Sequence, residues 1–298
     1  GEVYKGVLIP VITPFHEDNS VDEKVLRELV DFYVAASVHG LFALGSSGQG
    51  PVLSEAERKS VAEIVLDQNA GRVPAIIHVG CADTPTTVAL AKHAADAGAD
   101  AIGIVPPYYY CDAPPSAILE HYKAVSDAAP LPIYIYENPK YCGISISPEF
   151  GVKMKKEIPA IRGIKVAYGA GAMADYVKMF PDDVSVFTGN GDIFGLVPFG
   201  VAGMINPPTA AVPELCVALY EALDAKNYAA ARDLQDKVNR ITQMFIATQK
   251  KHGRGTLGET FRVRGFDVKR FPRWATDPLP EDARNTIRQA FCDAGIID

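Results

Sequence analysis

The sequence has no long hydrophobic run, no excess of positive charge and few cysteines. None of its apolar stretches reaches about 18 residues, the length expected of a membrane-spanning helix. The formal net charge of −7, without any Lys/Arg cluster, argues against a nucleic acid or an anionic membrane surface as a partner. The five cysteines are widely spaced and contain no CxxC pair, which predicts free thiols in a reducing cytoplasm. With 48% apolar and 22% charged residues, the chain has the composition of an ordinary globular protein.

Sequence signatures of metal and cofactor binding are also missing. No histidine–cysteine–carboxylate cluster has the spacing of a metal site, so we expect no catalytic metal. No GxGxxG motif follows the first expected strand, which disfavours a dinucleotide-binding domain, and we expect no cofactor. The six histidines fall mostly in expected helices or loops; His78, near the end of an expected strand, is the exception.

Eight short apolar runs alternate with helical patterns at a step of roughly 25 to 30 residues. Near-continuous apolar strands joined by helices are typical of a parallel sheet covered on both faces. Eight such units in about 225 residues favour a closed (β/α)8 TIM barrel over an open doubly wound sheet. The expected strands are Val7–Ile12, Leu41–Leu44, Ala75–Val79, Ala101–Val105, Ile133–Tyr136, Arg162–Val166, Ser185–Thr188 and Ala202–Ile205.

Helical patterns lie between these strands, and local signals mark where some of them begin. Ser54 followed by Glu57 predicts a capping box, in which each side chain accepts a hydrogen bond from the backbone N–H of the other residue. Pro213 suits the first turn of the eighth helix. The expected helices include Asp22–Ser37, Glu55–Asn69, Thr84–Ala97 and Ser116–Ala128.

After residue 226 the pattern becomes helical throughout. Residues Tyr228–His252 place apolar side chains along one face, as an amphipathic helix packed on a core does. Two shorter helical pieces follow, Gly255–Arg264 and Glu281–Ala294. This segment has too little core to fold alone. We therefore expect residues 1–225 to form a catalytic barrel and residues 226–298 a helical extension packed on it.

One lysine, Lys165, stands near the C-terminal end of the expected sixth strand. Desolvation there disfavours the ammonium form, and a neutral lysine amine is a nucleophile suited to Schiff-base formation with a carbonyl. The alternative is a strand-end lysine that snorkels to solvent with its stem on apolar neighbours. In a barrel of this type the reacting groups lie at the C-terminal ends of the strands and in the loops that follow, which is where Lys165 falls.

Other polar groups follow the C-terminal ends of the expected strands. The loop Gly45–Pro51 carries glycines, two hydroxyls and backbone N–H groups that can bind a carboxylate. Three tyrosines, Tyr108–Tyr110, follow the fourth strand. Tyr136 ends the fifth strand, and we expect it to face Lys165 across the barrel mouth. One site would then hold an amine, phenols able to relay protons and a pocket of hydroxyl groups.

Five of these motifs, in their order and spacing, resemble the dihydrodipicolinate synthase/N-acetylneuraminate lyase family. They are Gly45–Gly48, Leu53–Arg58, Pro107–Tyr109, Tyr136–Pro139 and Gly163–Lys165. The resemblance covers nearly the whole chain, from Gly6 through the C-terminal helices. It implies a class I aldolase or lyase, which forms a lysine Schiff base with pyruvate or another 2-keto acid on a (β/α)8 barrel.

The resemblance also implies roles for individual residues. Lys165 matches the imine-forming lysine, and Tyr136 matches the general acid/base. Ser46 and Ser47 match the hydroxyl pair that binds the ketoacid carboxylate. Tyr109 matches a tyrosine that extends the proton relay, often across a dimer interface. Further substrate-binding positions are Gly48, Tyr141, Gly189, Asp192, Ile205 and Asn206.

Departures from the family pattern bear on the second substrate. Tyr141 stands where the synthases have an arginine for that substrate's carboxylate, and a phenol cannot supply a bidentate cationic contact. Ala167 and the pair Gly191–Asp192 depart from the sialic acid lyase pattern. The run Gly50–Ser54, together with Pro107–Tyr110, is more similar to the 2-keto-3-deoxygluconate aldolase branch. In that branch Asp192 and Asn206 would be candidates for contacts with sugar hydroxyls; alternatively they cap a helix and form a turn.

The leading hypothesis is reversible aldol cleavage of a 2-keto-3-deoxy sugar acid, or a similar hydroxylated ketoacid, to pyruvate and an aldehyde. The alternatives are 4-hydroxy-tetrahydrodipicolinate synthesis, a dehydratase or deaminase that uses the same imine, and a ketoacid-sensing barrel without catalysis.

Exposed rings at Tyr108–Tyr110 would leave an apolar patch. Together with the resemblance, this patch predicts a homo-oligomer, a dimer or a dimer of dimers (a homotetramer). Alternatively, the rings fold back under the Cys111–Pro115 loop.

Overall fold

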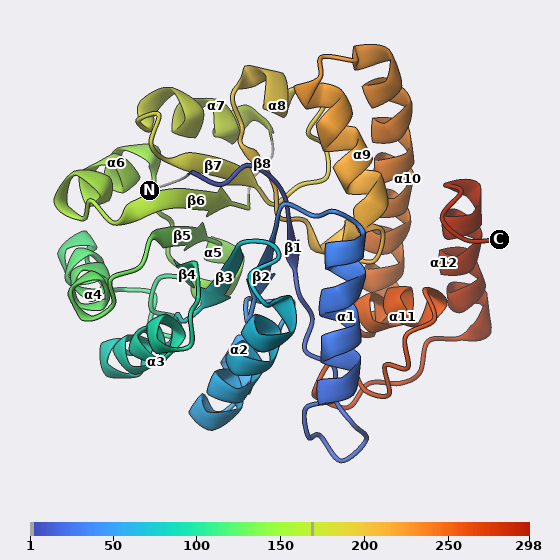
Figure 1. The fold of residues 1–298 in the computed structure, drawn as a ribbon, viewed down its shortest axis with the longest axis horizontal. Helices are drawn as coiled ribbons and strands as arrows, with labels where there is room; N and C mark the ends of the chain where they lie inside the picture. Colours follow the sequence, from blue (N-terminus) through green and yellow to red (C-terminus); the bar gives the residue numbers. More distant parts are fainter. Residues whose placement is uncertain (1–2, 168–169) are drawn as a thin grey trace.

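Eight parallel strands close into a barrel in the computed structural model, which describes residues 3–167 and 170–298. Each strand pairs with the next along the chain, and the eighth pairs back to the first, with Gly203 opposite Gly6. Figure 1 shows the barrel with its helices around it. The (β/α)8 prediction is thus confirmed. The strands are β1 (Gly6–Pro10), β2 (Gly40–Ala43), β3 (Ala75–His78), β4 (Ala101–Ile104), β5 (Ile133–Glu137), β6 (Ile161–Val166), β7 (Ser185–Thr188) and β8 (Gly203–Met204).

Every expected strand overlaps an observed strand, and only the ends differ. The largest difference is at β1, which stops at Pro10 although the apolar run continues through Ile12. Val11 and Ile12 are as buried as the strand itself, and so is Ile205 after β8. An apolar run in the sequence indicates which residues are buried, and here the buried residues continue past the strand ends into the loops. The sequence pattern therefore could not mark where the hydrogen-bonded ladder ends.

Two strand glycines make room for large buried rings. A Cβ atom on Gly103 would lie 2.7 Å from Phe42 Cζ. A Cβ atom on Gly163 would clash with the ring of Tyr134, which packs on Phe187 with ring centroids 6.3 Å apart. Close packing of this kind leaves no space for even one added methyl group, which fixes where these rings stand.

Two of the helices that surround the barrel begin with signals found in the sequence. Ser54 Oγ accepts a hydrogen bond from Glu57 N at 3.2 Å, and the Glu57 carboxylate accepts one from Ser54 N at 2.8 Å, so the capping box is confirmed. Pro213 is the first residue of its helix, as expected. The helices are α1 (Glu23–Ala35), α2 (Glu55–Asn69), α3 (Thr84–Asp96), α4 (Pro115–Ala128), α5 (Pro139–Cys142), α6 (Pro148–Glu157), α7 (Ala170–Met179), α8 (Leu196–Phe199) and α9 (Pro213–Asp224), with 3-10 turns at Gly50–Val52 and Pro207–Thr209.

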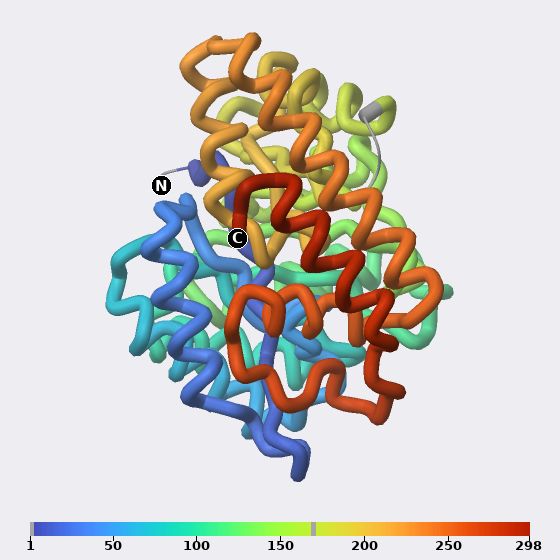
Figure 2. Tube along the Cα trace, turned by 90° about the vertical axis from the view of Figure 1, so that its right-hand side faces the viewer, coloured from blue at the N-terminus to red at the C-terminus, as the bar shows by residue number. Residues whose placement is uncertain are grey.

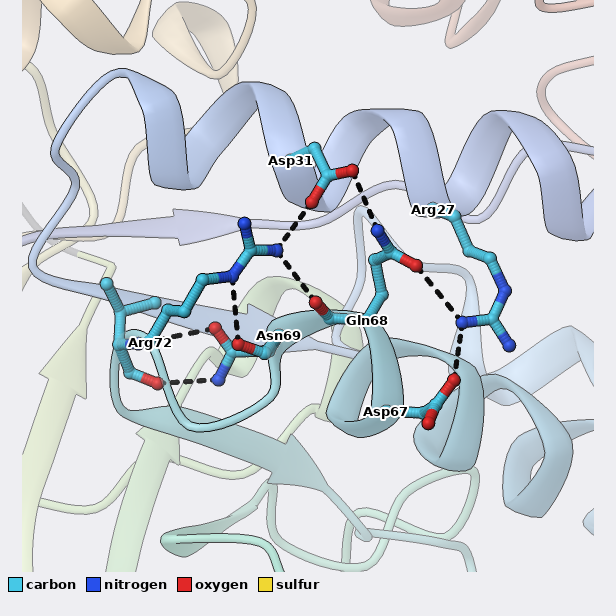
Figure 3. A network of polar contacts seen from close by, with 7 residues as sticks. Arg27, Asp31, Asp67, Gln68, Asn69 and Arg72 are labelled. Atoms are coloured by element: carbon cyan, nitrogen blue, oxygen red, sulfur yellow. Dashed lines mark hydrogen bonds and ion pairs between the residues drawn. The ribbon is translucent and has the colours of Figure 1, made fainter.

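A polar network joins α1 to α2 (Figure 3). Arg27 donates to the Asp67 carboxylate at 2.6 Å, and Gln68 donates to Asp31 at 2.7 Å. Arg72, just after α2, donates to the other oxygen of Asp31 at 2.5 Å. Because most of these groups are solvent-exposed, each contact contributes little to stability. Together they connect α1 to the C-terminal end of α2, the helix that follows the Gly45–Pro51 loop.

Three helices follow the barrel: α10 (Tyr228–His252), α11 (Gly255–Val263) and α12 (Glu281–Asp293). Helix α10 packs along α9, and Figure 2 shows α12 lying beside α10 on the outside of the molecule. The expected apolar face of α10 is buried at Ala231, Val238, Ile241 and Phe245. The division of the chain into residues 1–225 and 226–298 stays a prediction. No helix in the described ranges is long and apolar enough to cross a membrane.

Candidate active site

Lys165 points into a buried environment at the C-terminal end of β6. Its side chain is 5% exposed, and it pairs in register with Tyr136 of β5 and Phe187 of β7. The expectation that Tyr136 faces Lys165 across the barrel mouth is wrong. Consecutive strands are neighbours in a closed barrel, so the two residues lie side by side.

The amine of Lys165 is held against aromatic rings. Lys165 Nζ lies 4.5 Å from the centre of the Tyr136 ring and 5.9 Å from that of Phe42. Within the described part of the chain, no carboxylate lies within ion-pair distance of this amine. Gly189 stands beside the lysine stem, where an added Cβ atom would lie 3.6 Å from Lys165 Cε. An amine that is not engaged in an ion pair is available to attack a carbonyl carbon.

The hydroxyl of Tyr136 contacts two polar side chains of the site. Its hydroxyl accepts a hydrogen bond from Asn138 Nδ2 at 2.8 Å and lies 3.2 Å from Ser46 Oγ. Burial by itself would raise the pKa of Tyr136. The charge of Lys165 and the hydrogen bonds from Ser46 and Asn138 outweigh burial, and they hold the pKa of Tyr136 below its ordinary value. A phenol with a lowered pKa can take up and return a proton near neutral pH more readily than an ordinary tyrosine.

Asn138 was not identified as a functional residue from the sequence. It lies inside the Tyr136–Pro139 motif, but nothing in the motif says that its side chain turns back towards the phenol two residues earlier. The amide is 6% exposed, and it donates to the Tyr136 oxygen. A buried donor aimed at this oxygen stabilises the phenolate form.

The imidazole ring of His78 packs edge-on against the ring of Tyr136. Its ring centre lies 5.9 Å from that of Tyr136 at 90°, and its Nε2 accepts a hydrogen bond from Val105 N at 3.2 Å. Burial, followed by the charge of Arg58, holds the pKa of His78 well below its ordinary value. Because one ring nitrogen is occupied by a backbone donor, the geometry gives this histidine a packing role.

The Gly45–Pro51 loop is fixed in place beside Tyr136. Thr13 Oγ1 donates to the carbonyl oxygen of Gly48 at 2.6 Å. A Cβ atom on Gly48 would lie 2.8 Å from the backbone nitrogen of Leu44, so only glycine fits there. Ser47 is 3% exposed, and Ser46 directs its hydroxyl to Tyr136. The expected hydroxyl pair therefore lies next to the phenol.

Arg254, which precedes α11, reaches the same site from the C-terminal extension. One terminal nitrogen donates to Tyr141 Oη at 2.8 Å, and the other donates to the carbonyl oxygen of Ser46 at 3.2 Å. No sequence signal connected Arg254 with this site, because more than 200 residues separate it from the Gly45–Pro51 loop. Only the packing of the C-terminal helices brings it there.

A cavity of about 540 Å³, called the larger cavity below, opens above Lys165. A smaller cavity of about 200 Å³ adjoins it and shares Ser46, Tyr136, Asn138, Tyr141 and Arg254. The larger cavity is lined by Ser46, Ser47, Tyr136, Asn138, Lys140, Tyr141, Lys165, Ala167, Gly189, Pro207, Pro208, Phe245, Ile246, Gln249, Lys250, Arg254 and Leu257. Six of the expected site residues thus surround one space: Ser46, Ser47, Tyr136, Tyr141, Lys165 and Gly189.

The other expected site residues do not line the larger cavity. Asp192 is exposed, and Ile205 is fully buried. Asn206 Nδ2 donates to the carbonyl oxygen of Gly189 at 3.1 Å, while its Oδ1 accepts from Thr209 N at 3.1 Å, so its amide holds the loops after β7 and β8 together. Tyr109 is 82% exposed and has a φ of 84°, a left-handed conformation that is uncommon for a non-glycine residue.

No described group of three or more His, Cys, Asp or Glu side chains could hold a metal ion. The groups that line the site include an amine, a phenol with a lowered pKa, two serine hydroxyls and an amide. These groups suit imine formation and proton transfer.

A family model decides which proteins this chain is related to. The model of the dihydrodipicolinate synthetase family matches residues 3–293. The chain belongs to this family. A 4-hydroxy-tetrahydrodipicolinate synthase from Syntrophus aciditrophicus is 34% identical over 299 residues, which cover 99% of the chain and 100% of that relative. The likeness inferred from five sequence motifs is thereby confirmed.

Solved structures of the dihydrodipicolinate synthetase family and related aldolases share the fold. A dihydrodipicolinate synthase from Acinetobacter baumannii in complex with pyruvate is 27% identical, with a TM-score of 0.88 over 99% of this chain and 100% of that one. A catalytic-lysine mutant of a sialic acid aldolase from Ruminococcus gnavus is 25% identical, with a TM-score of 0.88 over 98% of this chain and 97% of that one. The protein is thus an enzyme of the class I, Schiff-base lyase and aldolase type that characterises the family.

Proposed function

We propose that the protein catalyses reversible aldol cleavage of a hydroxylated 2-keto acid through a Schiff base on Lys165. The observation that carries the proposal is the buried amine of Lys165, which lies against Tyr136, whose hydroxyl in turn is hydrogen-bonded by Asn138 and approached by Ser46. An amine and a phenol so close together supply the nucleophile and the proton donor that imine chemistry requires.

The proposed reaction begins when Lys165 Nζ attacks the keto carbon of the substrate and water leaves to give an imine. The protonated imine is an electron sink, so the bond between C3 and C4 can break to give an enamine and an aldehyde. Tyr136 takes the proton of the C4 hydroxyl as the aldehyde carbonyl forms. The phenol then returns a proton to C3, and water releases pyruvate and restores the amine.

Ser46 and Ser47 would bind the carboxylate of the ketoacid. Both line the larger cavity beside Lys165, and their loop is held by the contact between Thr13 and Gly48. A carboxylate bound there would place the neighbouring keto carbon towards the lysine amine. Such positioning lowers the barrier because the reacting atoms are already close and correctly oriented.

The substrate class that we propose is a 2-keto-3-deoxy sugar acid or a similar hydroxylated ketoacid, which would yield pyruvate and an aldehyde. The run Gly50–Ser54 resembles the 2-keto-3-deoxygluconate aldolase branch. Gln249 and Asn138 line the larger cavity and can form hydrogen bonds with hydroxyl groups. The second candidate is 4-hydroxy-tetrahydrodipicolinate synthesis, which is favoured by the name of the Syntrophus aciditrophicus relative.

Borohydride trapping tests the imine. Pyruvate plus borohydride is expected to add one reduced pyruvyl group, located on Lys165 by peptide mapping. Lys140 and Lys250 line the same cavity, so Lys140→Gln and Lys250→Gln are matched controls that should still be labelled at Lys165. An adduct on either of these lysines, or no adduct at saturating pyruvate, contradicts the proposal.

Product analysis separates the two candidate functions. The aldolase should release pyruvate from 2-keto-3-deoxygluconate, detected by coupling to lactate dehydrogenase. The synthase should instead consume pyruvate together with aspartate semialdehyde. Turnover of aspartate semialdehyde with no cleavage of the sugar acid would replace the first candidate by the second and leave the Schiff base in place.

We also propose that the protein is a homo-oligomer, either a dimer or a dimer of dimers, and that it acts in the cytoplasm. Tyr109 and Tyr110 are 82% and 75% exposed, and their rings contact each other with centres 5.0 Å apart. Two adjoining exposed rings form an apolar surface that a second copy of the chain would cover. The five cysteines are free thiols, in keeping with a reducing compartment.

A further inference from the structure

The charged side chains among the described residues that line the larger cavity are all cationic. Among the described residues that line it, four side chains are cationic, Lys140, Lys165, Lys250 and Arg254, and none is Asp or Glu. The whole chain carries a net charge of −7, so this lining runs against its overall charge. Lys165 and the two serines account for the ketoacid end of a substrate. The remaining three cations are more than one carboxylate requires.

Arg254 is the cation best placed to bind a second anionic group. It is half-buried, and its guanidinium donates to two neutral acceptors in the described part of the chain, the phenol of Tyr141 and the carbonyl oxygen of Ser46. In the described ranges no carboxylate forms an ion pair with it. A guanidinium carries five N–H donors in a planar fork, so these two contacts leave donors for a ligand.

Arg254 lies beside the aromatic ring of Tyr141. The guanidinium carbon of Arg254 lies 5.5 Å from the centre of the Tyr141 ring, and Lys140 Nζ lies 5.4 Å from the same ring centre. Arg254 and Tyr141 also line the smaller cavity, which is otherwise mostly apolar. The pair therefore stands where the space above Lys165 meets the space that would receive the rest of a substrate.

We propose that Arg254, oriented by Tyr141, binds an anionic group on the aldehyde partner, a carboxylate or a phosphate, and so selects acidic aldehydes over neutral ones. This inference rests on the proposed aldolase function, because it concerns the second substrate of the same site. Tyr141 cannot itself provide a cation. The guanidinium that reaches the site instead comes from the segment between α10 and α11.

Paired aldehydes test the inference with pyruvate as the common partner. One pair is succinate semialdehyde and butanal, and the other is glyceraldehyde 3-phosphate and glyceraldehyde. For wild type we expect kcat/KM to favour the acidic member of at least one pair, and the responding pair identifies the anion. In Arg254→Gln this preference should fall about 10- to 100-fold, mainly through KM for the aldehyde, since a hydrogen-bonded charge contributes on that scale.

Two further variants separate charge recognition from support of the loop. Arg254→Lys keeps the charge and should keep part of the preference. Lys251→Gln removes an exposed cation that does not line the cavity, and it should leave the preference as in wild type. If Arg254 only supports the carbonyl oxygen of Ser46, Arg254→Gln slows both members of each pair by the same factor. An unchanged preference of that kind overturns the inference.

A binding measurement keeps the inference separate from the aldolase proposal. Trp274 is the single tryptophan of the chain and lines the smaller cavity together with Arg254, so its fluorescence reports occupancy. Succinate should bind more tightly than butyrate to wild type, and Arg254→Gln should lose this difference. Failure of borohydride labelling at Lys165 refutes the proposed reaction alone. Equal binding of succinate and butyrate to wild type refutes the anion site alone.

Discussion

Replacing Tyr136 by phenylalanine removes one oxygen atom from the centre of the site. The ring contacts with Phe42 and His78, whose centres lie 5.8 and 5.9 Å from that of Tyr136, are available to phenylalanine as well. What is lost is the acceptor of the Asn138 amide and the contact with Ser46. Leaving the buried amide without its partner should lower the free energy of unfolding by about 1–3 kcal/mol. The fold should therefore persist.

The effect on turnover should be much larger than the effect on stability. In the proposed reaction the hydroxyl moves protons to and from the substrate, and loss of one general acid/base typically slows a reaction by about 10² to 10⁴. At about 1.36 kcal/mol per factor of ten, this corresponds to roughly 2.7–5.5 kcal/mol of transition-state stabilisation. Imine formation should be largely retained, because the amine of Lys165 is unchanged.

Three measurements check this reasoning. Borohydride trapping reports the imine, coupled pyruvate release reports turnover, and a pH profile of kcat/KM reports the phenol. Because the pKa of Tyr136 is lowered from its ordinary 10.0, wild type should show a titration below pH 10 that is missing in Tyr136→Phe. Tyr134→Phe, two residues earlier on β5, is the matched control and should keep this titration. Turnover by Tyr136→Phe close to that of wild type would refute the assignment and move the proton relay elsewhere.

Three further predictions concern stability, the loop and assembly. Arg273 forms a bidentate contact with Glu57, at 2.6 and 2.7 Å, and lowers the pKa of Glu57 from 4.5 to about 2. This contact should stabilise the folded state by about 1–2 kcal/mol after allowance for exposure. The stabilisation is present above pH 4.5 and is lost as the pH falls towards 2. Acid titration of unfolding should therefore show Glu57→Gln to be less stable than wild type at neutral pH and nearly equal to it near pH 2. Gly48→Ala should lower the free energy of unfolding by about 1–3 kcal/mol and slow turnover, since the added methyl group meets the backbone of Leu44, and undiminished turnover would contradict this role of the loop. Mixing Tyr109→Phe with Lys165→Ala should restore activity if Tyr109 serves a neighbouring subunit, and an oligomer without recovered activity would show that it does not.

The barrel could be predicted from the sequence because its strands are buried on both faces. Ile133–Glu137 and Ile161–Val166 appear as apolar runs for that reason. Some of the helices around the barrel also carry their own capping signal, as α2 does at Ser54. Lys165 could be recognised by the same principle, because burying an unpaired cation in an apolar strand is energetically unfavourable. These are local properties, which the order of residues records directly.

The partners of these residues depended on the tertiary structure. The sequence placed Tyr136 opposite Lys165, whereas closure of the barrel makes them neighbours on adjacent strands. The orientation of Asn138 towards the phenol and of Asn206 towards its loops was equally invisible, because a side-chain amide can serve either a ligand or the backbone.

The sequence alone thus determined the fold and the family, and it indicated the pair that we propose to react, Lys165 and Tyr136, because burial patterns and motif spacing are local in the chain. Only the tertiary structure decided what stands around that pair. Arg254 joins Tyr141 and Ser46 because α10 and α11 carry it to the barrel mouth, across more than 200 residues of chain from Ser46. A contact between such distant segments is set by how helices pack on the barrel, and no local pattern in the sequence encodes it.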